Sequence, residues 1–334
     1  MQKRMTHRPH FLLLMVVLLG NTASAGMFTR LPEARLTIRA VDEEGLPLRE
    51  MPVHVWLSES AIRDGETDEH GTFVAQGTCT IKDVPISIVR NGYYDSRVTY
   101  SYPNYLSVTN GIWQPWNPTV TVVVRRVVNP IPMYAKHIDG HGQHLRPNEW
   151  CAYDLVAGDW VRPTGKGVVT DILFRVSGTW HNYRNHDSVL TLAFPHTTDG
   201  VVPIVGPIVA GRLIIPFTAP TRGYEPTYVW HKSSKQGGPY YCNDTVTNEC
   251  ETVRTLLIRV RSSGSAFGVA TNALYGKLRN VEFGGAATNG TRVSFTYYLN
   301  PTPNDTNIEM DLKKNLLKNL VGSENISWVG PNFE

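Results

Sequence analysis

Apolar side chains recur at every second position through much of this chain, and this alternation restricts it to folds built from half-buried β-strands. The pattern is clearest at 36–40, 53–57 and 293–299, whereas the spacing of an amphipathic helix is almost absent. Clusters of Gly and Pro separate the alternating runs, as expected between short strands. The sequence therefore predicts an all-β protein with two consecutive β-sandwich domains.

The C-terminal region is the one place where a helix competes with a strand. Leu312, Leu316 and Leu320 form a stripe that suits a short amphipathic helix. Ile308 and Met310 alternate with Leu312, which suits an extended segment instead. The sequence leaves both alternatives open.

Residues 1–25 have the three parts of a secretory signal peptide. A basic start precedes the apolar run Phe11–Gly20, and the small residues Ala23–Ala25 follow it. The run is shorter than the roughly 20 residues that a spanning helix needs. We expect the mature protein to begin near Gly26, to be secreted or periplasmic, and to have no stable membrane insertion after cleavage.

The charge of the mature chain gives no support to a strongly anionic partner. The whole sequence has 32 Lys+Arg and 29 Asp+Glu, and three of the basic residues are Lys3, Arg4 and Arg8. Removal of residues 1–25 therefore leaves 29 basic and 29 acidic residues, a formal charge near zero. This balance gives no reason to expect nucleic acid as a partner.

Four cysteines remain in a chain that is expected to reach an oxidising compartment. Cys242 and Cys250 bracket a polar stretch typical of a loop between two strands, so we expect a disulfide between them. Cys79 and Cys151 could pair by elimination and tie the two halves together, or both could be buried free thiols.

The first half of the mature chain is punctuated by three turns. An acidic turn with Gly and Pro lies at 42–47, a Thr-Asp turn ending in Gly-Thr-Phe lies at 67–73, and a strand at 86–91 runs into Gly92 and two tyrosines. At these residues the chain resembles the carboxypeptidase regulatory-like (transthyretin-like) domain. The resemblance implies a seven-stranded prealbumin-like β-sandwich over 35–126, and it implies no catalytic residues. The aromatic insertion at 100–116 departs from the short loops of that family.

Residues 127–133 are expected to be a linker, because Pro130 and Pro132 favour extended backbone. A second β-sandwich-like domain is predicted over 134–334, and we recognise no named family in it.

A candidate metal site follows the linker. His137, Asp139 and His141 would share one face of a strand, a spacing that a divalent metal ion can use. The glycines at 140 and 142 favour a solvated loop instead. No cofactor-binding motif is present, so we expect no cofactor.

The aromatic insertion contains the candidate ligand-binding residues Tyr102, Tyr105, Trp113 and Trp116. Flat rings on β-sandwich loops can stack on sugars, which makes a glycan one candidate partner. The alternative, which we favour, is that the rings are buried against the second domain. An envelope protein is the other candidate partner.

Several carboxylates could serve general acid–base chemistry, but no spacing selects a pair of them, and the catalytic residues are unknown: Asp154, Asp159, Asp171, Asp187 and Glu225. The sequence has no nucleophile elbow, zinc-protease helix or nucleotide-binding loop. We therefore expect an exported, non-catalytic binding or structural protein of the cell envelope or extracellular space. The alternative is a secreted hydrolase that acts on carbohydrate, with its site in the C-terminal domain.

Overall fold

The computed structural model is an all-β protein, and the predicted fold class is confirmed. It describes residues 31–140, 145–182, 184–235, 238, 240–244, 255–266, 269–284 and 290–326. The predicted signal peptide, His141 and Cys250 lie outside these residues. Within them, no helix is both long enough and apolar enough to cross a membrane.

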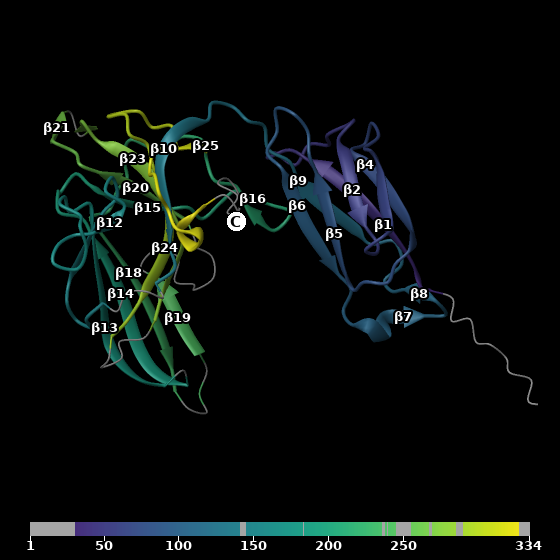
Figure 1. The fold of residues 1–334 in the computed structure, drawn as a ribbon, viewed down its shortest axis with the longest axis horizontal. Coiled ribbons are helices and arrows are strands. Elements are labelled where there is room, and N and C mark those ends of the chain that lie inside the picture. The colour runs from purple at the N-terminus through teal and green to yellow at the C-terminus, as the bar shows by residue number, and fades with distance from the viewer. Residues whose placement is uncertain are drawn as a thin grey trace, which may run out of the picture.

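The strands form two bodies that share no sheet (Figure 1). One sheet of the first body has the order β4-β1-β8-β7, with β9 also paired to β1. Its strands are β1 (Glu33–Val41), β4 (Thr72–Thr78), β7 (Val108–Thr109), β8 (Ile112–Trp113) and β9 (Thr119–Val123). The facing sheet has the order β3-β2-β5-β6. Its strands are β2 (Pro52–Trp56), β3 (Ile62–Glu66), β5 (Asp83–Ile88) and β6 (Ser96–Ser101). The short 3₁₀ helix η1 (Tyr105–Ser107) precedes β7.

The core of the first body follows directly from the alternation in the sequence. Leu36 and Ile38 of β1 are fully buried, and they share one apolar cluster with Val53 and Val55 of β2. Period-two burial on both strands is what a sheet with one face on a core requires. Within residues 31–126, seven strands remain when β7 and β8, which belong to the aromatic insertion, are set aside.

The predicted turns form as their residues require. The Asp42 carboxylate accepts hydrogen bonds from the N–H groups of Glu44 and Leu46, and Asp68 closes the second turn in the same way. Gly71 has φ +71°, and a Cβ there would lie 2.7 Å from the Ala40 carbonyl oxygen. Only glycine fits this position.

The second body is a larger sandwich of two six-stranded sheets. The first has the order β15-β20-β23-β24-β10-β25: β10 (Ile131–Ile138), β15 (Gly200–Pro203), β20 (Thr255–Val260), β23 (Leu274–Phe283), β24 (Val293–Leu299) and β25 (Met310–Asn315). The second has the order β12-β11-β13-β14-β18-β19: β11 (Cys151–Asp154), β12 (Asp159–Trp160), β13 (Ile172–Asn182), β14 (Asn185–Ala193), β18 (Thr227–Ser234) and β19 (Tyr240–Asp244). Two small hairpins and a 3₁₀ helix complete it: β16 (Ile208–Val209) with β17 (Arg212–Leu213), β21 (Gly264–Ala266) with β22 (Val269–Thr271), and η2 (Gly322–Glu324).

The main core of the second body lies between its two large sheets and includes Phe174, Leu192 and Phe295.

The connection between the bodies contains more strand than the sequence indicates. β10 begins at Ile131, inside the segment expected to be a linker. Pro132 is accommodated because the pairing of β10 with β25 shifts register between Ile131 and Met133, and proline is tolerated at such irregularities. At the C-terminal end, Met310–Asn315 is a strand rather than a helix.

Both described cysteine side chains are free thiols. Cys79 is buried in the core of the first body and Cys151 is half-buried on β11. Burial raises the pKa of both thiols. The pairing of Cys79 with Cys151 is therefore absent, whereas the predicted Cys242–Cys250 bridge lies outside the residues whose side chains are described.

Candidate functional site

The junction between the two bodies is organised by one buried carboxylate. Glu309 is 1% exposed, and its Oε1 accepts hydrogen bonds from the Tyr94 hydroxyl at 2.6 Å and the Val128 N–H at 2.9 Å. Its Oε2 accepts the N–H of Asn129. The Asn307 amide donates to the Asn129 carbonyl at 2.7 Å. These bonds fix the connecting chain against the second body.

Replacing Glu309 by Ala should loosen the junction, because it removes the acceptor of a half-buried hydroxyl and of two N–H groups. We expect the free energy of unfolding to fall by roughly 1–3 kcal/mol, and the radius of gyration in small-angle scattering to rise. Asp311→Ala is the matched control, since Asp311 is more exposed and bonds only to its own segment. Unchanged dimensions of the Glu309→Ala protein would contradict this role.

A hairpin of the second body reaches the first body beside this junction (Figure 1). β16 and β17 are joined by Ala210 and Gly211, both with positive φ (50° and 75°), which is the geometry of a two-residue hairpin turn. Arg212 of this hairpin donates to the Arg97 carbonyl of the first body at 2.7 Å. Ile214, just after it, packs with Val41 and Val123 of the first body.

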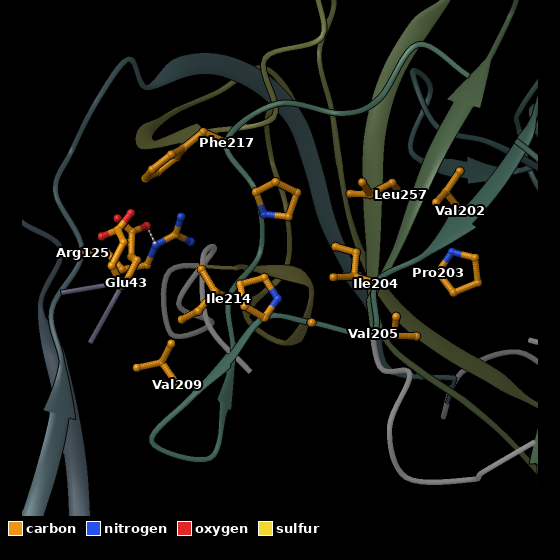
Figure 2. Close-up of a pocket in the computed structure, with 14 residues that line it drawn as sticks. Glu43, Arg125, Val202, Pro203, Ile204, Val205, Val209, Ile214, Phe217 and Leu257 are labelled. Carbon is orange, nitrogen blue, oxygen red and sulfur yellow. Dashed lines mark hydrogen bonds and ion pairs between the residues drawn. The ribbon is translucent and has the colours of Figure 1, made fainter. Parts of the chain in front are cut away.

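A groove of about 840 Å³ lies between the two bodies. Figure 2 shows its two ends, with Glu43 and Arg125 of the first body at one and the 202–205 segment with Leu257 at the other. The segment with Val209, Ile214 and Phe217 crosses between them. The lining is mostly aliphatic, and Pro203, Pro207 and Pro216 contribute no backbone N–H to it. The groove therefore offers apolar contact area and few hydrogen-bond donors.

Three charged residues form one end of the groove: Glu43 and Arg125, which pair with each other, and the exposed Glu44. The Arg125 side chain is 1% exposed; its Nε donates to Glu43 Oε1, and its guanidinium lies 4.2 Å from the centre of the Phe217 ring. A buried cation requires such a partner. Glu43 and Arg125 thus neutralise each other, and Glu44 is the exposed carboxylate that this end presents to a ligand.

The candidate ligand-binding aromatics divide into two groups. Tyr102 and Trp113 are each 1% exposed, and their rings stack at 4.6 Å inside the core of the first body. Trp113 Nε1 donates to the Cys79 carbonyl at 2.8 Å, and burial raises the pKa of the Tyr102 phenol. Neither ring can reach a ligand or the second body, because β8 directs Trp113 inward. This corrects both roles foreseen for these two residues.

Tyr105 and Trp116 lie on the outside of the same insertion, 67% and 38% exposed. They remain open to a partner, and they do not contact the second body in the groove.

The candidate metal ligands are only partly gathered. His137 and Asp139 line a pocket of about 310 Å³ together with Asp159 and Glu324. His137 Nδ1 lies 2.8 Å from Thr296 Oγ1, and burial lowers the pKa of its imidazole. Among the described residues no cluster of three or more His, Cys, Asp or Glu could hold a metal ion. His141 is outside that part of the chain, so the three-residue site stays a prediction.

Two of the candidate catalytic carboxylates form a buried ion cluster with one arginine. Arg261 donates to both oxygens of Asp171, at 2.7 and 2.9 Å, and to Asp154 at 2.7 Å. Burial raises the pKa of Asp171. Burial alone would also raise the pKa of Asp154. However, Asp154 accepts hydrogen bonds from the backbone N–H groups of residues 157, 168 and 169 and lies beside Arg261, and together these lower its pKa below the ordinary value. These carboxylates order loops of the second body and are not placed to react with a substrate.

The other three candidate carboxylates do not contact Arg261 in the described residues, although Asp159 lies opposite Asp154 in the pairing of β11 with β12. Asp159 accepts the N–H groups of Trp160 and Lys166, and Asp187 pairs with His231 at 2.7 Å on an exposed hairpin. Glu225 lies elsewhere, at a backbone bridge to Val201.

The groove was not predicted from the sequence, because its residues lie far apart in the chain. One signal was available: the apolar segment 201–217 contains three prolines, which prevent it from being a central strand and leave part of its apolar surface uncovered.

Comparisons with known proteins do not identify a function for this chain. No protein family matches the chain, and no curated protein is significantly similar to it. The 3-chlorocatechol 1,2-dioxygenase of Rhodococcus opacus 1CP is 13% identical over 29% of this chain, with a TM-score of 0.23, and the match spans 60% of the dioxygenase. BcpA, the major pilin subunit of Bacillus cereus, is 6% identical over 80% of this chain and 96% of its own, with a TM-score of 0.22. Neither likeness supports an inference about activity or partners.

Proposed function

We propose that this chain is an exported, non-catalytic binding protein of the cell envelope or extracellular space, and that it holds an uncharged, elongated apolar ligand in the groove between its two bodies. The groove is the observation that carries the proposal. Its volume of about 840 Å³ is in the range of small-molecule and short-peptide sites. Export rests on the signal-peptide pattern of residues 1–25, and the localisation is secreted or periplasmic.

The chemistry of the groove supports an uncharged ligand. The Arg125 guanidinium is paired with Glu43, so a ligand carboxylate would have to break a buried ion pair there and would also meet the Glu44 carboxylate. Pro203, Pro207 and Pro216 have no backbone N–H, so they cannot donate hydrogen bonds to an extended ligand in the groove. Binding would therefore come from apolar contact with side chains such as Val205 and Ile204.

The fixed junction supports a structural role for the pair of bodies. Glu309 and the Arg212 contact hold groove walls that come from different bodies, and a preformed site loses less entropy on binding. The first body is proposed to be a transthyretin-like module. That assignment is supported by the turns that Asp42 and Asp68 close, and by the seven strands that remain when the aromatic insertion is set aside.

A secreted carbohydrate hydrolase remains the alternative function. It would need two carboxylates facing one groove. Asp154 and Asp171, the two that share a partner, are bound by Arg261 and by backbone N–H groups. No observation in the described residues favours this alternative.

The proposal is tested by binding of a fluorescent peptide of alternating valine and threonine, blocked at both ends so that it carries no terminal charge. Val205 lines the groove and is 56% exposed, so Val205→Asp should not affect folding. We expect it to weaken peptide binding at least about tenfold, because the new carboxylate must be desolvated beside the ligand. Val168→Asp is the matched control, since Val168 is 76% exposed and lies outside the groove. Equal affinities of the two variants in fluorescence anisotropy would refute the proposal.

A further inference from the structure

The aromatic insertion of the first body ends in an exposed apolar tip. Leu106 of η1 is 90% exposed and Tyr105 is 67% exposed, while Trp116 and Ile112 are 38% and 36% exposed. Leu31, where the described chain begins, is 59% exposed. We call these five side chains the apolar tip. In Figure 1, η1, β7 and β8 lie at the lower end of the first body, away from the groove.

The tip is held rigidly from inside. Trp113, on the inward face of β8, anchors the insertion to the core through its stack on Tyr102 and its bond to the Cys79 carbonyl. The Gln114 N–H donates to the Ser107 carbonyl at 2.8 Å, and the Ser107 N–H donates to the Asn104 carbonyl at 3.1 Å. Leu106 therefore cannot fold back onto the body, and its apolar surface stays available to a partner.

The segment that forms the tip carries no charge. Between Arg97 and Arg125 the sequence has no Asp, Glu, Lys, Arg or His. The neighbouring loop brings Lys82 and Asp83 to this end, and they pair with each other at 3.2 Å. Glu33, which pairs with Ile112, is the carboxylate beside the tip and is half-buried, so the insertion itself can leave water without stripping a charged side chain of its own of hydration. Tyr and Trp, which have an apolar body and one polar atom, favour the interfacial zone of a bilayer.

The path of the chain places this end of the body toward a membrane. Glu33 of β1 pairs with Ile112 of β8, and its N–H donates to the Gly111 carbonyl at 2.9 Å. The chain from the apolar run Phe11–Gly20 therefore enters the body beside the tip. The residues between Gly20 and Leu31 can span about 40 Å at most. During export, while the apolar run is still held by the bilayer, the membrane therefore lies within that distance of the tip.

We infer that the apolar tip is a docking surface for the interfacial region of a lipid bilayer. Leu106 and Tyr105 enter the headgroup region, and Trp116 and Ile112 rest at its edge. The contact is peripheral and reversible, because only a few side chains are buried and no segment spans the membrane. It needs no anionic lipid, since the tip offers no cation. This surface is separate from the groove and does not depend on the ligand proposed for it.

The test is sedimentation of the exported protein with neutral phosphatidylcholine vesicles, using the N-terminus that export leaves. We expect Leu106→Ser to lower the vesicle partition coefficient about tenfold, the equivalent of one buried leucine side chain. Leu46→Ser is the matched control. Leu46 is 60% exposed but lies in the turn after β1, at the opposite end of the first body, and should have no effect. Adding phosphatidylglycerol should change wild-type binding less than twofold.

Each other outcome overturns the inference. Wild-type protein that stays in the supernatant has no bilayer affinity. Equal partition of wild type and Leu106→Ser assigns membrane binding to another part of the chain. A concentration-dependent dimer that Leu106→Ser abolishes, without vesicle binding, makes the tip a protein interface. Near-ultraviolet circular dichroism of Leu106→Ser should match wild type, because this side chain is almost fully exposed.

Discussion

Trp113→Ala is expected to destabilise the protein by about 3–5 kcal/mol, the cost of removing a large aromatic side chain from a packed core. Trp113 is 1% exposed, stacks on Tyr102 at 4.6 Å and donates a 2.8 Å hydrogen bond to the Cys79 carbonyl. Its loss leaves both a cavity and an unpaired buried carbonyl. Since whole domains are stable by only about 5–15 kcal/mol, the first body should unfold at much lower urea concentration.

Trp116→Ala is the matched control, in the same insertion and with the same chemistry of substitution. Trp116 is 38% exposed, so its replacement should cost less than about 1 kcal/mol. Urea unfolding followed by tryptophan fluorescence measures both variants. Equal losses of stability would mean that the two rings have similar surroundings, contrary to the structure.

Arg261→Ala should destabilise the second body by about 3–5 kcal/mol, because it leaves two buried carboxylates without their cation. The side chain of Asp171 is 0% exposed and that of Asp154 is 5% exposed, and Arg261 contacts both. Arg146→Ala is the control. The side chain of Arg146 is 80% exposed and forms only a 3.7 Å surface pair with Glu149, so its loss should change stability by less than about 1 kcal/mol.

The pH dependence of Arg261→Ala provides a second readout. Without the guanidinium, burial raises the pKa of the Asp171 carboxyl further above the unfolded value, so the folded variant binds a proton there more readily than its unfolded chain. Its stability should rise as the pH falls from 7 through this raised pKa. The Asp154 carboxyl of the wild type has a lowered pKa, and its contribution is lost as the pH falls through that value. The difference between wild type and variant should therefore be largest near pH 7 and shrink toward pH 4. A difference independent of pH would contradict the ion cluster.

The fold was predictable because its signals are local. Period-two alternation at 36–40 and 53–57 determines which side chains of β1 and β2 face the core, and the Asp-initiated turns at 42–46 and 68–72 close as their side chains dictate. The same reasoning failed in the linker. There, pairing of Ile131 with Met310 across the chain, rather than local composition, decides where β10 begins.

The sites were less predictable because they depend on register and on distant contacts. Trp113 and Trp116 lie three residues apart and have the same chemistry, yet the pairing of Val108 with Trp113 turns one ring inward and leaves the other outside. Asp154 and Asp171 are ordinary carboxylates in the sequence. Only the folded chain brings Arg261 to them. The groove is lined by residues from Glu43 to Leu257, and no spacing in the sequence reveals that they lie together.

The measurement that tests the proposed groove most directly is an NMR titration of Ile, Leu and Val methyl groups with the blocked valine–threonine peptide. We expect saturable shifts at Ile204, Val205 and Ile214, which line the groove, and at few methyl groups elsewhere. In Val205→Asp protein these shifts should require at least about ten times more peptide. Shifts confined to Leu106 and Ile112 would place apolar binding at the tip alone, and no shifts at millimolar peptide would mean that the groove is not a binding site.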